Sequence, residues 1–150
     1  MTAAMPPPDS FEIFLVAIPG LEAAILDEAR SKGFATARIV KGGISMTGGW
    51  HDVWRANLEL RGPSRVLARI AAFRVLHLAQ LDKRARRVSW TSVLRGGVPF
   101  RVEATCIKSK IYHSGAAAQR IERAIIEETG AARAAEAELC IKARIEDDLC

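Results

Sequence analysis

A chain of 150 residues, of which 49% are hydrophobic and 26% charged, is long enough to bury a core as one medium domain or two very small ones. This composition excludes a wholly disordered protein, and no apolar run is long enough to cross a membrane as a helix. The opening residues MTAAMPPPDS lack the basic segment and apolar stretch of a secretory signal. Three cysteines stand far apart without a CxxC pair, which fits a reducing cytosol and gives no metal-site spacing. We therefore expect a cytoplasmic globular protein without a membrane partner or a metal site.

The positive charge is concentrated in the middle of the chain. Residues 1–60 carry five basic and seven acidic side chains, residues 61–125 carry fourteen basic against three acidic, and residues 126–150 carry three basic against seven acidic. The excess over 61–125 favours a polyanionic partner, because neutralised phosphates release counterions. Arginine outnumbers lysine there, which suits bidentate phosphate contacts and stacking on bases. A general preference for arginine throughout the protein is the alternative.

Residues 1–9 are expected to form a flexible, proline-bearing tail. Beyond them, the apolar spacing changes between the strand period of two and the helical period of 3.6. In chain order the pattern predicts a strand over 11–17, a helix that follows Pro19-Gly20-Leu21-Glu22 and ends at Gly33, a strand over 35–40, a tight turn at 41–43, a strand over 44–47, a helix from Trp50 that is broken at Gly62-Pro63, and a longer strand over 65–75. One antiparallel sheet backed by two helices satisfies this βαββαβ order with right-handed crossovers, which is a ferredoxin-like arrangement.

Each of these two predicted helices carries an apolar stripe. In the first helix, the residues expected to be buried are Leu21, Ala24, Ile25 and Ala29. In the second helix, one side carries Trp50, Val53, Trp54 and Leu58. We expect its two tryptophans to be core residues rather than platforms for stacked bases.

The second half of the chain predicts a short helical segment, a strand, a longer helix and a further strand. Their expected bounds are Leu76 to Arg87, Phe100 to Cys106, Ser114 to at least Thr129, and Glu138 to Ile145. The turn Glu146-Asp147-Asp148 is followed by two residues of a returning strand. We expect this arm to leave an unpaired edge and the natural protein to continue beyond it.

The loop before the longer helix is a candidate anion site. It carries Lys108, Lys110 and His113, and Ser114 is the expected N-cap of the helix. A helix start with free backbone N–H groups, flanked by two lysines and a histidine, is suited to holding a phosphate. The alternative is a solvated loop whose lysines keep the protein soluble.

Two further sets of cations are candidate contacts to a nucleic-acid backbone. The run Lys83, Arg84, Arg86 and Arg87 could grip phosphates, although a charge run is as often a solvated helix face. Arg65 follows the Gly62-Pro63 turn, and we divide its expected role between RNA contact and pairing with Glu59.

Five stretches, in order and at consistent spacing, resemble the N-terminal region of the THUMP-containing class I RNA methyltransferases, including the ribosomal large-subunit type. They are Ile18-Pro19-Gly20-Leu21-Glu22, Lys41-Gly42-Gly43-Ile44-Ser45, Asn57-Leu58-Glu59-Leu60-Arg61-Gly62-Pro63-Ser64-Arg65-Val66-Leu67, Val88-Ser89-Trp90, and Phe100 to Ile125 with its Ser109 and His113. The likeness runs from about Phe11 to the end. The chain departs from the family at Gly62-Pro63 and in the basic Lys108-Ser109-Lys110, which leaves the individual RNA contacts open.

The resemblance implies an α+β chain with a ferredoxin-like subdomain over 10–75 and a THUMP α/β subdomain over 76–150 that is incomplete at its C-terminus. It also implies an RNA-binding module that positions ribosomal or transfer RNA for a guanine-N2 methyltransferase domain that uses S-adenosylmethionine and lies C-terminal in the parent protein. The chain itself has no glycine-rich loop after a strand and no Asn-Pro-Pro-Tyr-like motif. No cofactor, catalytic residue or activity is therefore expected of these 150 residues.

Two other functions remain open at this point. The THUMP module also occurs in 4-thiouridine synthases and in some pseudouridine synthases and deaminases. Ferredoxin-like folds also serve as protein-interaction or regulatory modules, so the fold alone does not decide the function.

Overall fold

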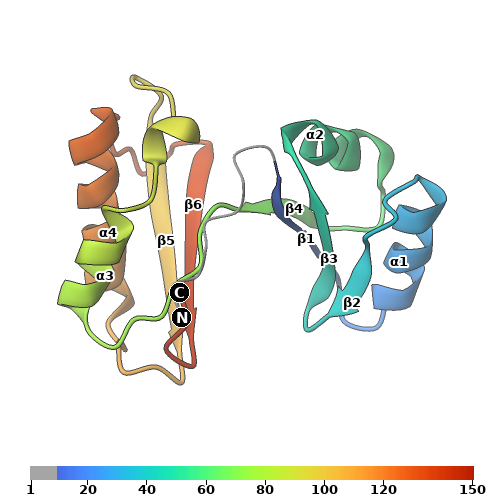
Figure 1. The fold of residues 1–150 in the computed structure, drawn as a ribbon, viewed down its shortest axis with the longest axis horizontal. Coiled ribbons are helices and arrows are strands. Elements are labelled where there is room, and N and C mark those ends of the chain that lie inside the picture. Colours follow the sequence, from blue (N-terminus) through green and yellow to red (C-terminus); the bar gives the residue numbers. More distant parts are fainter. Residues whose placement is uncertain (1–9) are drawn as a thin grey trace. The chain divides into compact units, whose positions relative to one another are not determined.

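The computed structural model describes residues 10–150, which form two compact units, residues 10–71 and residues 72–150 (Figure 1). Each unit is described by itself. The tail predicted for residues 1–9 lies outside the described residues.

The first unit has the predicted βαββαβ order. Its elements are β1 (Phe11–Val16), α1 (Glu22–Ser31), β2 (Arg38–Val40), β3 (Gly43–Gly48), α2 (Trp50–Glu59) and β4 (Arg65–Arg69). The four strands form one sheet in the order β2-β3-β1-β4, and every neighbouring pair is antiparallel. Since consecutive parallel strands are here separated by one antiparallel strand, the two helices make split crossovers, and the ferredoxin-like prediction is confirmed.

The core of the first unit lies between one face of the sheet and the two helices. Its cluster joins alternate residues of the central strands to small or aliphatic residues of the helices; the cluster includes Ile13, Leu15, Ile44 and Met46 from the sheet, Ile25 and Ala29 from α1, and Ala56 from α2. Because both helices contribute to this one cluster, they cover the same face of the sheet. The opposite face carries the intervening residues of each strand.

Two glycines of the first unit are required by close packing. A Cβ at Gly43 would lie 2.0 Å from the backbone oxygen of Leu15, on the neighbouring strand. A Cβ at Gly62 would lie 2.7 Å from Cγ1 of Ile25 on α1. At both positions only glycine allows the backbone to approach its neighbour this closely.

Several predictions for the first unit are wrong in detail. Leu21 and Ala24 are exposed, so the buried stripe of α1 is reduced to Ile25 and Ala29. The fourth strand ends at Arg69 rather than near residue 75, and the second unit begins at residue 72.

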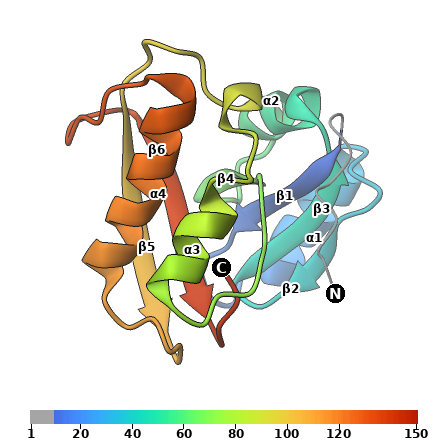
Figure 2. The same ribbon diagram turned by 60° about the vertical axis from the view of Figure 1, so that its left-hand side comes forward.

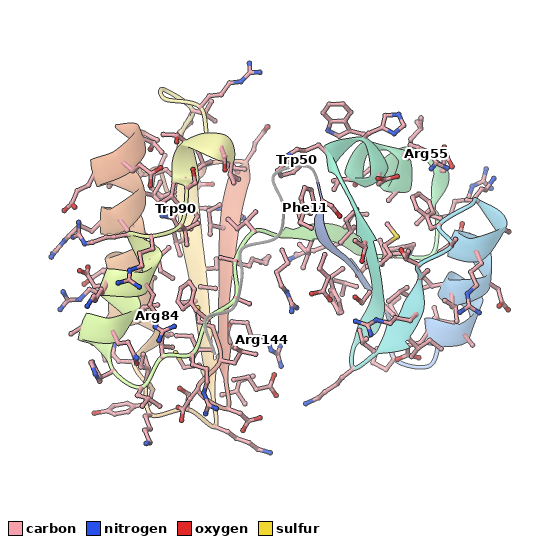
Figure 3. All side chains as sticks on the ribbon, in the orientation of Figure 1. Phe11, Trp50, Arg55, Arg84, Trp90 and Arg144 are labelled. Atoms are coloured by element: carbon pink, nitrogen blue, oxygen red, sulfur yellow. The ribbon has the colours of Figure 1, made fainter. Side chains whose placement is uncertain are left out.

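The predicted core tryptophans of α2 are largely at the surface. Trp50 is 40% exposed and Trp54 67% exposed, and Leu58 is 86% exposed. Trp50 still packs against Phe11, with ring centroids 4.9 Å apart (Figure 3). The helix instead approaches the sheet through the fully buried Ala56, whose small side chain allows close contact.

The second unit is built on two long parallel strands. Its elements are α3 (Leu78–Ala85), a 3-10 turn (Trp90–Ser92), β5 (Phe100–Ile107), α4 (Ser114–Thr129) and β6 (Leu139–Glu146). β5 and β6 pair in parallel, and α3 and α4 lie together on one side of them (Figure 2). This organisation agrees with the expected α/β THUMP subdomain, so the predicted α+β fold class is confirmed.

The core of the second unit lies between the two strands and their helices. Its fully buried residues include Phe100, Ile145, Ile125, Leu81 and Val75. Trp90 is also buried and donates its indole N–H to the Ala85 carbonyl at the end of α3. Gly130, with φ +67°, ends α4 in the left-handed conformation.

The last described residues do not leave an unpaired edge, so that prediction is wrong. Asp147 and Asp148 both have positive φ angles and reverse the chain after β6. Phe73 and Cys150 then exchange two backbone hydrogen bonds of 2.8 Å, and the Val75 N–H donates to the Asp148 carbonyl at 2.8 Å. The returning arm is therefore paired with the segment that enters the second unit.

Candidate nucleic-acid interface

Three cations line one open hollow along α3 in the second unit: two lie in the helix, and Arg87 lies two residues beyond its end. Lys83, Arg84 and Arg87 share it with His77, Ala79 and Gln80, and its volume is about 380 Å³. The arrangement follows from helical spacing, since residues three and four apart share a face. The opposite face of α3 buries Leu81 and Ala85. The hydrophobic core thus fixes the direction in which the basic face points, and Figure 3 shows Arg84 on this helix.

The N-terminal wall of the hollow is held by a reciprocal cap. The Gln80 N–H donates to Nδ1 of His77 at 3.2 Å, and the Leu76 N–H donates to Oε1 of Gln80 at 2.7 Å. One free amide of the first turn, that of Gln80, and the amide of Leu76 just before the cap are satisfied in this way. His77 and Gln80 are therefore positioned by the helix itself.

Arg86, also part of the predicted basic run, has a different environment. Its guanidinium binds Asp82 on α3 and Glu127 on α4, so it fastens the two helices together. The hydrogen bond from Arg86, opposed by partial burial and aided by the charges of Arg86, Arg120 and Arg123, lowers the pKa of Asp82. The structure therefore separates Arg86 from the three cations of the hollow.

Asp148 holds the loop between β5 and α4 in place through two hydrogen bonds. Oδ1 of Asp148 accepts from the Lys110 N–H at 2.9 Å and from the Ser109 hydroxyl at 3.1 Å. The first of these bonds, with a smaller contribution from Ser109 and nearby cations, lowers the pKa of Asp148. Ile111 is buried beneath the loop, while the side chains of Lys108 and Lys110 are exposed.

The N-cap of α4 is His113 and not Ser114, so that prediction is wrong by one residue. Nδ1 of His113 accepts from the Ala116 N–H at 3.0 Å, and Ser114 is the first helical residue. Both His113 and Ser114 are exposed. The imidazole thus takes one amide of the first turn that would otherwise be open to an anion.

The loop lies at one end of the second unit, and the hollow follows α3 from His77 at its start to Arg87 beyond its end. β5 and β6 both point to this end, and the N-termini of α3 and α4 also lie there (Figures 1 and 2). The hydrogen bonds of Asp148 to Lys110 and to Val75 join the loop to the segment that leads into α3. In open parallel sheets, ligands bind beyond the carboxyl ends of the strands.

Arg65, by contrast, belongs to the first unit. It is the first residue of β4, and its side chain is exposed without an ion pair among residues 10–150. The predicted partner Glu59 is instead held by Arg55, at 3.1 Å from two guanidinium nitrogens. The structure therefore groups the predicted site residues into the hollow, the loop and Arg65 on its own.

Most of the central cations are unpaired. Of the fourteen basic residues between 61 and 125, all of which the structure describes, only Arg69, Arg86 and Arg101 make ion pairs with described residues. The predicted excess of charge is therefore not neutralised internally. Arg120 and Arg123 were not among the predicted contacts, yet α4 places their charges beside Asp82 on α3.

His77 and Gln80 were also missed by the sequence reasoning. Their spacing of three residues at the start of an apolar-periodic segment is a capping signal that could have identified them. Among residues 10–150 there is no group of three His, Cys, Asp or Glu side chains that could hold a metal ion. No helix in that range is long and apolar enough to cross a bilayer.

Comparison with known proteins gives the same organisation. Residues 12–67 match the model of the RlmL ferredoxin-like domain. The chain is 31% identical over 116 residues to the ribosomal RNA large subunit methyltransferase K/L of Syntrophotalea carbinolica, and 29% identical over 119 residues to that of Pseudomonas paraeruginosa. These alignments cover 77% and 79% of this chain, but only 16% of each relative.

A solved structure shares the fold. A predicted N6-adenine-specific DNA methylase from Listeria monocytogenes superposes with a TM-score of 0.78 at 22% identity, over 93% of this chain and 38% of that one. The resemblance of the chain to the N-terminal region of the ribosomal RNA methyltransferases is therefore confirmed, and the part that matches a family model, residues 12–67, is similar to the RlmL ferredoxin-like domain.

Proposed function

We propose that these 150 residues bind RNA and position it for a catalytic domain elsewhere in the parent protein. The relatives are ribosomal RNA methyltransferases, and the chain spans about a sixth of their length. The substrate would be ribosomal RNA, or transfer RNA, and the catalytic domain would use S-adenosylmethionine. No residue of this chain is assigned to that cofactor or to catalysis, and the location proposed for the protein is the cytoplasm.

The observation that carries this proposal is the convergence of Lys83, Arg84 and Arg87 on one hollow without ion pairs among residues 10–150. Unpaired guanidinium groups, here those of Arg84 and Arg87, suit bidentate contacts to phosphate. The loop residues Lys108, Lys110, His113 and Ser114 would extend the contact within the same unit.

The test is the salt dependence of RNA binding by the whole chain. The triple variant Lys83→Ala, Arg84→Ala, Arg87→Ala should lower the slope of log affinity against log salt by about two, because each phosphate contact contributes roughly 0.7 for single strands. Binding is measured by fluorescence anisotropy with a structured RNA at several salt concentrations.

A matched control removes the same charge from another surface. Arg101, Lys142 and Arg144 lie on β5 and β6, where each is paired with Glu103 or Glu146. Arg144 points away from α3 and α4 (Figure 3). Their triple alanine variant should change the slope by less than about 0.5. Equal effects of the two triple variants, or salt-independent binding, would contradict the proposal.

The loop is tested separately. The double variant Lys108→Ala, Lys110→Ala should reduce the same slope by roughly one to two. Asp148 receives only backbone and Ser109 hydrogen bonds from this loop, so both bonds should survive the change. A double variant with the slope of the wild type would remove the loop from the interface and leave the hollow in it.

A further inference from the structure

Neither helix of the first unit, as described over residues 10–71, covers the outer face of its sheet. Both helices pack on the face that carries Ile13 and Leu15. On the other face, the strand register places Phe14 of β1 opposite Ser45 of β3 and Leu67 of β4. One aromatic side chain therefore stands on a central strand, in the middle of a row that crosses the sheet.

The ring of Phe14 leans across β3. Its Cζ lies only 3.1 Å from where a Cβ of Gly43 would be, and 3.9 Å from that of Gly42. The end of the ring therefore lies over the backbone of Gly43, where any other residue would place a side chain. Phe14 is half-buried rather than enclosed.

Arginines flank this aromatic ring on the same face. Arg38 lies opposite Ser45 on the edge strand β2, and Arg65 lies opposite Val16 on the edge strand β4. Both are exposed and make no ion pair with described residues. Glu12, the one carboxylate of the described strands on this face, is occupied by the Ser45 hydroxyl at 2.7 Å and by Arg69 at 3.0 Å.

We propose that this sheet face binds unpaired RNA bases, with one base stacked on Phe14 and the adjoining phosphates held by Arg38 and Arg65. The inference rests on the proposed function and adds a second, chemically different contact to it. A planar apolar surface between two unpaired cations complements a base joined to phosphates. The bases of a duplex are stacked on one another, so none of them is free to stack on Phe14. An apolar protein surface would leave Arg38 and Arg65 without partners.

The test uses the whole chain with two probes of equal length. One is a single-stranded oligonucleotide with 2-aminopurine at internal positions, and the other is a fully paired duplex. Phe14→Leu keeps an apolar side chain over Gly43 and removes the stacking surface. It should weaken binding of the single strand about 5- to 150-fold and abolish the fluorescence quenching, while duplex affinity changes less than about twofold.

Phe14→Tyr is the matched control, since it keeps an aromatic ring and should retain both affinity and quenching. Far-UV circular dichroism of Phe14→Leu confirms that the sheet is intact. If that variant is unfolded, Arg38→Ala, Arg65→Ala serves instead, and it should lower the salt slope for the single strand by about 1.4 while leaving its quenching in place.

The outcomes separate this inference from the proposed function. Wild-type affinity and quenching in Phe14→Leu would overturn the sheet site, and the hollow of α3 would remain as the interface if its own variant lowers the slope. A dimer of the chain in sedimentation velocity that Phe14→Leu dissociates would also overturn it, because a second copy would then cover the face. A wild-type chain that binds neither probe would overturn both.

Discussion

The two units of this chain have similar proportions of charge but present them differently. Residues 10–71 contain eight basic and six acidic side chains, and residues 72–150 contain fourteen basic and ten acidic. In the first unit α2 exposes two large apolar side chains, Trp54 and Leu58. In the second unit α3 and the turn after it present the cations Lys83, Arg84 and Arg87. Net charge therefore does not distinguish the units; the placement of unpaired groups does.

The largest expected effect tests whether the sheet of the first unit tolerates any side chain at Gly43. Gly43→Ala places a methyl group against the Leu15 carbonyl, so the strands must separate. We expect the free energy of unfolding of the first unit to fall by about 3 kcal/mol or more, measured by urea denaturation with circular dichroism. Gly33→Ala is the control: it has a positive φ and open space, and should cost about 1 kcal/mol. Equal losses of unfolding free energy in the two variants would show that the sheet can accommodate a Cβ between residue 43 and the Leu15 carbonyl.

The tryptophans provide the next contrast. Trp90 is buried and bonded to the Ala85 carbonyl, whereas Trp54 is 67% exposed. Trp90→Phe should lower the free energy of unfolding by about 1 to 2 kcal/mol, because the smaller ring leaves a gap in the core and the Ala85 carbonyl keeps only the Val88 N–H as a donor. Trp54→Phe should change it by less than about 0.5 kcal/mol. A larger loss of stability for Trp54→Phe than for Trp90→Phe, in the same urea titrations, would contradict the difference in burial between the two tryptophans.

A smaller effect is expected at the N-cap of α4. His113→Ala should cost about 1 kcal/mol of stability, and His113→Asn should restore it, since asparagine is a favoured N-cap. RNA affinity separates the cap from a phosphate contact. If His113 also binds phosphate, the asparagine variant should recover the thermal midpoint without recovering affinity. Failure of asparagine to restore stability would argue against the cap.

The smallest effect concerns acid stability of the second unit. The pKa of Asp148 is lowered mainly by the Lys110 N–H, so its folded value lies below its unfolded value. The stabilisation is present at neutral pH and is lost as the pH falls below about 4, through the folded value. Asp148→Asn, which tolerates the left-handed backbone, should therefore reduce the loss of urea midpoint between pH 6 and pH 3. If Asp148→Asn leaves the loss of urea midpoint between pH 6 and pH 3 unchanged, other carboxyl groups cause the acid sensitivity.

The element order could be predicted because each strand and helix has a clear local period. The exposure of Trp54 could not, since spacing shows which residues share a helix face but not which face meets the sheet. Here the small Ala56 allows α2 to approach the sheet and leaves the larger side chains outside. A pattern of large apolar residues alone favours the opposite orientation.

The site was predictable to a similar degree. The run from Lys83 to Arg87 is visible in the sequence, but the assignment of Arg86 depends on Glu127, which is 41 residues away. The apolar period of a helix does not show at which residue the helix begins, so it could not distinguish His113 from Ser114 as the N-cap. Long-range pairing and boundary geometry therefore required the structure.

The ladder between Phe73 and Cys150 has a mechanical consequence. Because these residues exchange both backbone hydrogen bonds, the polypeptide enters the second unit and reaches residue 150 at neighbouring points. Tension applied along the chain at those points would load this short ladder before it reached the packed interior. The two hydrogen bonds between Phe73 and Cys150 would then break before the helices that carry the cations unfold.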